Sequence, residues 1–216
     1  MVMLQGSLLN LADPGEGAAS DGPILRPVGE GMTRRDLGMG AWIDVRPAWL
    51  SGGEDLLFDL WRDVPWRAEK RQMYDSIVDV PRLTCFYDQD APLPHPTLGA
   101  ARRRLSEHYR AELGEDFETL GLCLYRDGRD SVAWHGDRIG RSRDSDTMIA
   151  ILSLGADRPL SLRPRGGGPS IKVAAGHGDL VVMGGSCQRT YDHAILKTSA
   201  AVGPRVSVQF RVQGVR

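Results

Sequence analysis

From Phe117 to the C-terminus, short runs of alternating apolar and polar residues are separated by glycine-rich turns. A period of two predicts β-strands, because successive side chains of a strand point to opposite faces. The expected strands are Thr119–Tyr125, Ser131–His135, Thr147–Leu154, Pro159–Arg163, Ser170–Val173, Leu180–Met183, Tyr191–Ile195 and Arg205–Val212. Many short strands with glycine-rich turns are typical of an antiparallel sandwich or barrel.

The last of these strands contains RVSVQFR, whose alternation is unusually clean. One face carries Val206, Val208, Phe210 and Val212, and the other carries Arg205, Ser207, Gln209 and Arg211. Desolvating a guanidinium costs several kcal/mol unless an anion pairs with it. Two arginines on one face of a buried strand therefore predict that both point into the fold and hold an anion there.

Two amphipathic helices are expected upstream of these strands. The first begins near Glu54, an acidic residue that favours a helix N-terminus, and ends before Pro65. The second covers Thr97–Leu113, with Thr97 as its N-cap and Gly114 as its C-terminal stop. Both carry apolar residues at helical spacing, which predicts that one face of each helix packs on the rest of the fold.

The N-terminal segment, residues 1–35, is rich in Gly, Pro, Ser and Asp and shows little periodicity. We expect it to be loop-like and poorly ordered. The stretch Ala41–Leu50 alternates enough to predict one more strand. The expected organisation is a poorly ordered start followed by a single catalytic domain over residues 36–216.

Composition narrows the function classes. The formal net charge of −1 gives no overall basic field of the kind that marks a tight, non-specific nucleic-acid binder. The cysteines Cys85, Cys123 and Cys187 are odd in number and lack zinc-type spacing, so we expect reduced thiols that are mostly buried. No apolar run approaches the roughly 20 residues that span a bilayer, and no signal peptide is evident. We therefore expect a cytoplasmic protein, and a monomer.

The sequence His135-Gly136-Asp137 is a candidate metal site. On a strand, residues two apart share a face, so His135 and Asp137 would present an imidazole and a carboxylate side by side. A third ligand is expected from His193, with His177 in the polar turn GHGD as the competitor. Two histidines and one carboxylate on one face of a metal suit non-haem iron(II). The alternative is a polar loop that happens to carry a histidine.

An H-x-D, a later histidine and an R-x5-R strand together make the pattern of the AlkB family of iron(II) and 2-oxoglutarate dioxygenases. The chain resembles this family from about Trp61 to the C-terminus. GHGDLVVMGG at Gly176–Gly185 is similar to the segment before the second histidine, and MYDSIVDVPRLTCFYD at Met73–Asp88 is similar to a substrate lid. The resemblance implies a mainly β (α+β) fold, a double-stranded β-helix or jelly roll with the N-terminal helices packed outside and a lid at about residues 66–90.

The resemblance also implies the cofactor site. His135, Asp137 and His193 would bind Fe(II), the co-substrates being 2-oxoglutarate and O2. Arg205 and Tyr125 would bind the far carboxylate of 2-oxoglutarate, and Arg211 would lie near the metal-proximal one; an ordinary ion pair with Asp137 is the alternative for Arg211. Where many relatives have Asn-x-Tyr, this chain has Cys123-Leu124-Tyr125. A thiol is a weak hydrogen-bond donor, so we expect about ten- to a hundredfold weaker co-substrate binding, which Cys123→Asn would reverse.

The activity implied by the family is oxidative dealkylation of N-alkylated bases in DNA or RNA, with DNA favoured, releasing formaldehyde, succinate and CO2. The base would have to be in a single strand or flipped out of a duplex. Candidate substrate contacts are Tyr74, Arg82 and Trp66 in the lid, which is expected to turn at Pro81, and Arg138 after the H-x-D. Core packing for Trp66 and a solvated loop for Arg138 are the alternatives.

Two other functions are compatible with the sequence. A dioxygenase of the same fold would hydroxylate a protein, a lipid or a small molecule, which the near-neutral charge permits. A low-turnover module that binds nucleic acid or metal would result if Cys123 weakens the co-substrate site enough.

Overall fold

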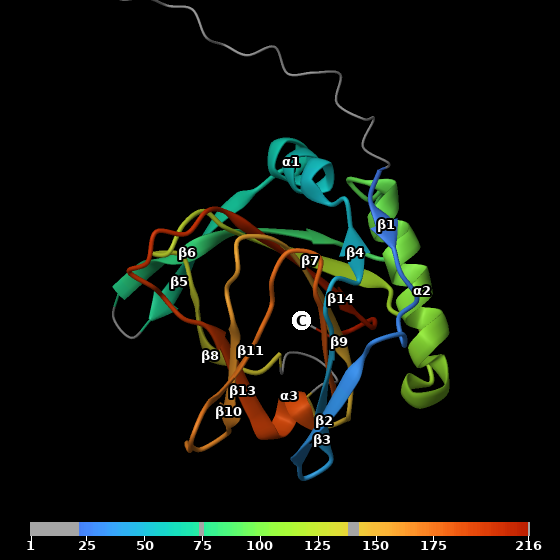
Figure 1. The fold of residues 1–216 in the computed structure, drawn as a ribbon. Helices are drawn as coiled ribbons and strands as arrows, with labels where there is room; N and C mark the ends of the chain where they lie inside the picture. Colours follow the sequence, from blue (N-terminus) through green and yellow to red (C-terminus); the bar gives the residue numbers. More distant parts are fainter. Residues whose placement is uncertain (1–21, 74–75, 138–142, 216) are drawn as a thin grey trace, which may run out of the picture.

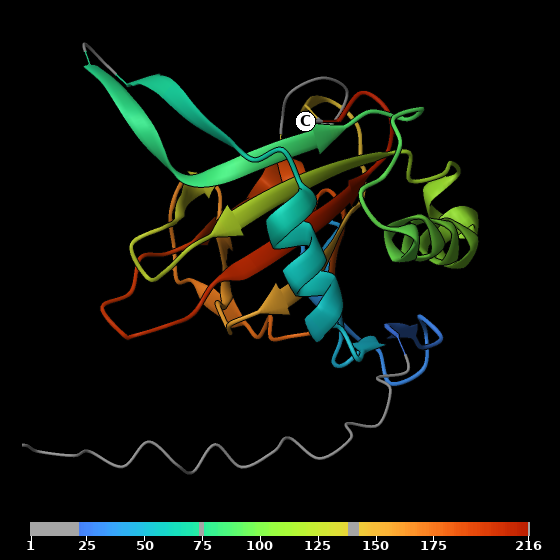
Figure 2. The ribbon, with the colours of Figure 1, turned by 90° about the horizontal axis from the view of Figure 1, so that it is seen from above.

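A computed structural model describes residues 22–73, 76–137 and 143–215 of the chain. Its larger sheet has eight antiparallel strands in the order β2-β3-β12-β9-β14-β7-β6-β5. These strands are β2 (Thr33–Gly38), β3 (Ala41–Arg46), β12 (Leu180–Gly185), β9 (Ile149–Gly155), β14 (Arg205–Arg211), β7 (Thr119–Tyr125), β6 (Ser76–Tyr87) and β5 (Arg67–Met73). The hairpin of β5 and β6 extends away from the body of the fold (Figure 2).

A smaller sheet faces the larger one (Figure 1). It has four antiparallel strands in the order β11-β10-β13-β8, namely β11 (Ile171–Val173), β10 (Leu160–Pro164), β13 (Tyr191–Ile195) and β8 (Val132–His135). A short pair joins β1 (Ile24–Leu25) to β4 (Leu50–Ser51). The mainly β jelly roll expected from the sequence is confirmed, and the expected strands after Phe117 agree with the observed ones to within two residues at each end.

Two helices, α1 (Glu54–Asp63) and α2 (Pro96–Leu113), lie outside the two sheets (Figure 1). Their apolar faces pack on the outer face of the larger sheet, where Leu56 and Leu105 are fully buried with the apolar side of β14. A single helical turn, α3 (Cys187–Thr190), precedes β13. Among the described residues, no helix is both long and apolar enough to cross a membrane.

The alternation of β14 divides the interior into two parts, as its sequence predicts. Val206, Val208 and Phe210 are fully buried on the helix side of the larger sheet. Arg205, Ser207, Gln209 and Arg211 face the other way and line a cavity between the two sheets. A second apolar cluster, which includes Ile151, Val181, Met183, Leu160 and Ile195, borders that cavity.

Two local predictions about the N-terminal half were wrong. The expected strand Ala41–Leu50 is broken between β3 and β4, because Ala48 adopts a positive φ of 48°. Residues 22–35, expected to be loop-like, contain β1 and the start of β2, while residues 1–21 lie outside the described part. Most residues of β2 are exposed at the sheet edge, so this strand leaves no apolar alternation in the sequence.

Two turn or cap predictions also need correction. The N-cap of α2 is His95, whose Nδ1 accepts a hydrogen bond from the Thr97 N–H at 3.2 Å, and Pro96 takes the first helical position that proline favours. Pro81 lies inside β6 rather than in a turn. It sits where the register with β5 shifts and where pairing with β7 has not yet begun, so no ladder hydrogen bond is lost.

All three cysteines are unpaired, as expected, but only Cys187 is buried. Cys85 and Cys123 are half-buried. Cys123 is accessible from the cavity, because it lies on the interior face of β7.

Replacing Phe210 with Ala should destabilise the protein by about 3 to 5 kcal/mol, because the ring is fully buried between the larger sheet and the helices. Chemical denaturation of both proteins measures the difference. Phe58→Ala is the matched control, since that ring on α1 is 61% exposed, and it should change stability by less than about 1 kcal/mol. Equal effects of the two substitutions would contradict the assigned core.

Candidate metal and co-substrate site

The pairing of β8 with β13 brings two histidines together. His135 lies directly opposite His193 in the antiparallel register, and their ring centroids are 4.3 Å apart. The carboxylate of Asp137 joins them, so that one ligand atom from each residue lies within 4.8 Å of the others. The three residues predicted as ligands are thus gathered in one place, although they come from segments more than 50 residues apart in the sequence.

Asp137 reaches this place differently from the way the sequence predicts. β8 ends at His135, so Asp137 lies beyond the strand and shares no strand face with it. Its backbone N–H donates to Oε1 of Gln188 at 3.0 Å. Gln188 is fully buried on α3, the turn that leads into the strand of His193. The carboxylate is therefore positioned by a contact with the segment that carries the other histidine.

The hydrogen bonds of His135 and Asp137 orient their metal-binding atoms toward each other. Nδ1 of His135 lies 2.8 Å from the carbonyl oxygen of Ala133, which can only accept, so this nitrogen carries a proton and Nε2 is the ring atom available to a metal. Nε2 lies 3.4 Å from Oδ1 of Asp137, while the other oxygen, Oδ2, accepts from Nε of Arg211 at 3.0 Å and from Nη2 at 2.8 Å. When Nε2 is deprotonated, two lone-pair donors face each other, an arrangement that a cation would stabilise.

Protonation at neutral pH suits a divalent metal. Burial, followed by the nearby His135, lowers the pKa of His193 to about 3, so its imidazole is neutral. Burial alone would raise the pKa of Asp137, but Arg211 and the two histidines outweigh it and hold that pKa well below its usual range. A neutral imidazole and an ionised carboxylate are the forms that ligate metals. The donor set fits iron(II), which takes two histidines and a carboxylate.

A cavity of about 580 Å³ adjoins the metal ligands. Its walls are largely apolar, and the cations Arg82, Arg205 and Arg211 are set into them. Tyr125 and Cys123 also line it. Burial raises the pKa of Tyr125, whose ring centroid lies 5.4 Å from the guanidinium carbon of Arg205. All four residues that the sequence assigned to the co-substrate thus border one cavity.

The side chain of Arg205 is buried and has hydrogen-bond donors that fit an anion. It is 2% exposed, and burial lowers its pKa from the usual value. Nη2 donates to Oγ of Ser153 at 2.8 Å, but Nε and Nη1 have no hydrogen-bond partner in the described part of the chain. Leaving charged donors unsatisfied in a buried site is costly, so this pair of N–H groups fits a carboxylate that enters the cavity.

Of the predicted substrate contacts that lie in the described part of the chain, only Arg82 lines the cavity. Arg82 is half-buried on β6 and lines the cavity. Trp66 packs against the helix-side core and donates from Nε1 to the carbonyl oxygen of Trp61 at 3.1 Å, and it is not among the described residues that line the cavity. Tyr74 and Arg138 lie outside the described residues.

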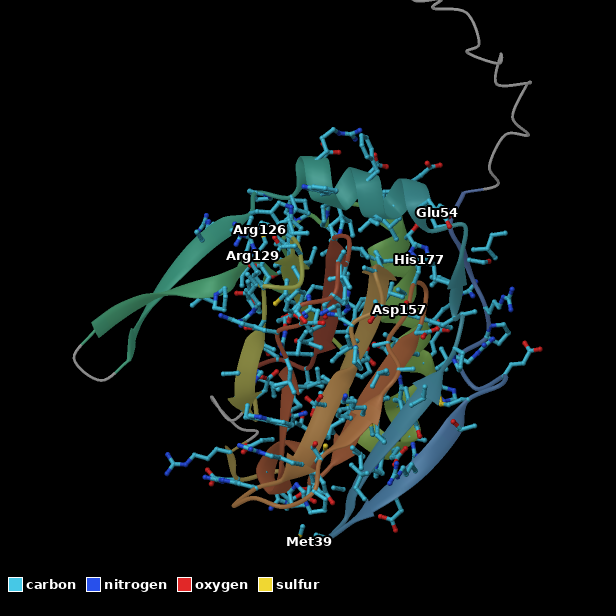
Figure 3. All side chains as sticks on the ribbon, turned by 60° about the vertical axis from the view of Figure 1, so that its left-hand side comes forward. Met39, Glu54, Arg126, Arg129, Asp157 and His177 are labelled. Carbon is cyan, nitrogen blue, oxygen red and sulfur yellow. The ribbon has the colours of Figure 1, made fainter. Side chains whose placement is uncertain are left out.

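His177, the competing ligand, lies away from the metal cluster. Its Nδ1 accepts from the N–H of Gly155 at 3.0 Å, and its Nε2 is 3.9 Å from the carboxylate of Glu54. Figure 3 shows it beside the N-terminal end of α1. Its position indicates a role in joining α1 to the end of β9 rather than in binding a metal.

Sequence reasoning missed two buried polar residues near the site. Gln188 gives no signal, because its position on a single helical turn depends on contacts distant in sequence. Arg158 donates to three backbone carbonyls, those of Asp127, Asp130 and Leu196, and so ties the loop before β8 to the loop after β13. An arginine in a strand-flanking turn has too many structural uses for its sequence alone to reveal this role.

Comparison with known proteins agrees with this geometry. The profile of the 2OG-Fe(II) oxygenase superfamily matches residues 69–211. The human alpha-ketoglutarate-dependent dioxygenase alkB homolog 3 is 31% identical over 193 residues, covering 79% of this chain and 63% of that protein. The human DNA oxidative demethylase ALKBH2 is 29% identical over 163 residues, covering 72% and 59%. The chain thus spans about three-fifths of the length of these relatives.

Two solved structures share the fold. The structure of OsALKBH1 superposes with a TM-score of 0.54 at 15% identity, covering 88% of this chain and all of that one. An oxidoreductase of the 2OG-Fe(II) oxygenase family from Burkholderia pseudomallei gives a TM-score of 0.53 at 12% identity, covering 85% of each chain. These likenesses confirm the double-stranded β-helix.

This chain therefore belongs to the 2OG-Fe(II) oxygenase superfamily. His135, Asp137 and His193 form its candidate facial triad, the donor set that iron(II) takes. Relatives named as AlkB homologues, at about 30% identity over most of the chain, confirm the resemblance predicted from the sequence.

Replacing His135, Asp137 or His193 with Ala should abolish stoichiometric binding of Mn(II), a redox-stable probe for the iron site, because each substitution removes one of three protein ligands. Calorimetric titration measures the binding. His177→Ala is the matched control and should bind Mn(II) as the unaltered protein does. Loss of binding in His177→Ala, with full binding in His193→Ala, would overturn the choice of third ligand.

Gln188→Met should weaken Mn(II) binding by about ten- to a hundredfold, because it leaves the Asp137 N–H unpaired and the carboxylate less well positioned. The same titration measures this. Gln213→Met is the control, since Gln213 is exposed and bonds only to Gln89 among the described residues. Unchanged metal affinity in Gln188→Met would show that Arg211 alone positions Asp137.

Proposed function

We propose that this protein oxidatively removes N-linked alkyl groups from bases of nucleic acid, with single-stranded or flipped-out DNA as the favoured substrate. The reaction class is carried by one observation: a buried arginine with two unpaired donors shares a cavity with a His-Asp-His cluster. The substrate class is supported by a relative named as a DNA oxidative demethylase. A monomeric, cytoplasmic enzyme is part of the same proposal.

In this proposal His135, Asp137 and His193 bind iron(II). Arg205, with the Tyr125 hydroxyl, binds the far carboxylate of 2-oxoglutarate, because Nε and Nη1 of Arg205 have no hydrogen-bond acceptor among the described residues. Arg211 keeps Asp137 ionised and pairs with its Oδ2, while Oδ1 faces His135. When bound, iron(II) with 2-oxoglutarate and O2 supplies the oxidising chemistry that hydroxylates the carbon attached to nitrogen, after which formaldehyde leaves.

The protein's own part is to position the base and to exclude water. The apolar walls of the cavity shield the reacting carbon, and Arg82 offers a cation for a phosphate or a base edge. Tyr74 and Arg138 are further proposed substrate contacts, and their assignment rests on the sequence alone. The cavity lies between two sheets, so a base stacked inside a duplex would have to leave the stack before it could enter.

The protein should release formaldehyde from methylated single-stranded DNA when iron(II) and 2-oxoglutarate are both present. Omitting either one, or replacing His193 with Ala, should remove the signal, because the ligand set or the co-substrate is then incomplete. Methylated RNA and duplex DNA, assayed in parallel, rank the substrates.

One outcome would contradict the substrate class without touching the reaction class. If 2-oxoglutarate is turned over at the same rate with and without any DNA or RNA strand, and no strand binds in a salt-dependent manner, the enzyme acts on another kind of molecule.

A further inference from the structure

The loop between β7 and β8, residues 126–131, joins parts of the fold that are distant in sequence. The carbonyl oxygen of Gly128 accepts from the N–H of Thr198, in the segment after β13, at 2.9 Å. The last loop residue, Ser131, donates from its N–H to the carbonyl oxygen of Pro81 on β6 at 2.7 Å. We refer to residues 126–131 as the bridging loop, because it lies between the strand of the lid and the segment that follows the second metal histidine.

Arg158 holds the bridging loop from inside the fold. It is 2% exposed, and burial lowers the pKa of its guanidinium from the usual value. Nη1 donates to the carbonyl oxygen of Asp127 at 2.9 Å, and Nη2 donates to those of Asp130 and Leu196, each at 2.8 Å. The two aspartate carboxylates pair with exposed arginines of the loop itself. A planar guanidinium that donates to three carbonyls determines the relative positions of the segments that carry them.

The bridging loop supports β6 where that strand has no strand partner. Within the described part of the sheet, residues 80–82 take part in neither the register with β5 nor that with β7. The N–H of Ser131 therefore supplies a hydrogen bond of the kind that a neighbouring strand supplies elsewhere in β6. All three residues of this segment line the cavity. Figure 3 shows Arg126 and Arg129, which belong to the bridging loop, beside the base of the hairpin of β5 and β6.

The direction in which Arg82 leaves the backbone depends on this hydrogen bond. The carbonyl group of Pro81 and the N–H of Arg82 belong to one planar peptide unit. Holding the carbonyl oxygen therefore orients the plane from which the chain of Arg82 departs. Arg82 is half-buried and lines the cavity, so a change in this plane moves a cation at the place where a base would enter.

Gly128 indicates how closely the bridging loop is packed. A Cβ atom at this position would come within 2.4 Å of the carbonyl oxygen of Thr198 and 3.1 Å of that of Ala200. Real Cβ atoms do not approach other atoms closer than about 3.0 Å, so alanine would push the loop away from the segment after β13. Gly128→Ala therefore displaces the loop while every donor of Arg158 is kept.

We propose that Arg158 is a positioning residue that fixes where Arg82 enters the cavity, by holding the bridging loop against Pro81. This inference rests on the proposed function, in which Arg82 meets a phosphate or a base edge. Arg158 is too buried to contact a substrate itself, so its effect passes through the loop. The metal ligand His135 is held separately, by the pairing of β8 with β13.

Amide hydrogen exchange of the free protein, followed by NMR, tests the positioning step without a substrate. In Arg158→Met, which keeps much of the volume but no donor, the Ser131 amide should exchange about tenfold faster or more, because the loop that presents it is no longer held. Gly128→Ala should have the same effect. Arg102→Met is the matched control, since Nη1 of Arg102 on α2 also donates to two backbone carbonyls, and it should leave this exchange unchanged.

Binding of a methylated single strand of DNA to the Mn(II)-loaded protein tests the consequence for the substrate. Arg158→Met should weaken binding about tenfold, while Mn(II) affinity changes less than about threefold. Adding Arg82→Ala to Arg158→Met should weaken binding little further, because the two residues act through one contact. Arg82→Ala and Arg102→Met should instead be additive. Arg158→Lys keeps the charge but not the fork of donors, so it should bind the strand as weakly as Arg158→Met.

Three outcomes would overturn the inference: unchanged Ser131 exchange in Arg158→Met, additive effects of Arg158→Met and Arg82→Ala, or full recovery of strand binding in Arg158→Lys. If Arg158→Met fails to fold, Gly128→Ala and Arg158→Lys provide the same comparisons. If the unaltered protein binds no strand, the proposed function fails instead, and the exchange measurement still decides whether Arg158 holds the bridging loop.

Discussion

A carboxylate that must stay ionised inside the fold is the constraint on which the rest of this structure depends. Asp137 is buried, and its charge is stabilised chiefly by Arg211, which places two donors on one of its oxygens. Arg211 in turn needs the space above Gly121 and the face of β14 that looks into the cavity. A shift of β14 by one residue would turn both of its arginines toward the apolar, helix-covered face of the sheet. The chemistry of the site therefore depends on the register of this strand.

The same constraint explains why metal and co-substrate belong together in this cavity. Arg205 and Arg211 are cationic, Asp137 is the anionic metal ligand, and the pKa of His193 keeps its ring neutral. A divalent cation alone would add charge to a cavity that already holds an uncompensated guanidinium at Arg205. In the proposed complex a dicarboxylate would offset both, with one end at Arg205 and the other at the metal. Each ligand therefore lowers the electrostatic cost of binding the other.

The meeting of His135 with His193 was expected from the motifs shared with the AlkB family. Alternation along the chain was enough to predict most strands and the inward face of β14. These features follow from a period of two that each strand carries within itself. The incorrect predictions share a different cause, which is contact with segments distant in the sequence. The position of Asp137 beyond β8, the cap at His95, and Pro81 within β6 depend on what a distant segment places beside them. Gln188 is the extreme case, because a single helical turn has no pattern of its own.

Cys123 shows why a departure from a family motif should be judged in three dimensions. Along β7, replacing an amide by a thiol looks like the loss of a donor. Across the sheet, the space beside Cys123 and above Gly121 holds the amide of Gln209, which comes from β14. Antiparallel pairing makes these positions neighbours although they lie more than 80 residues apart in the sequence. Antiparallel pairing thus places an amide from β14 beside the thiol on β7, and Gly121 leaves it room.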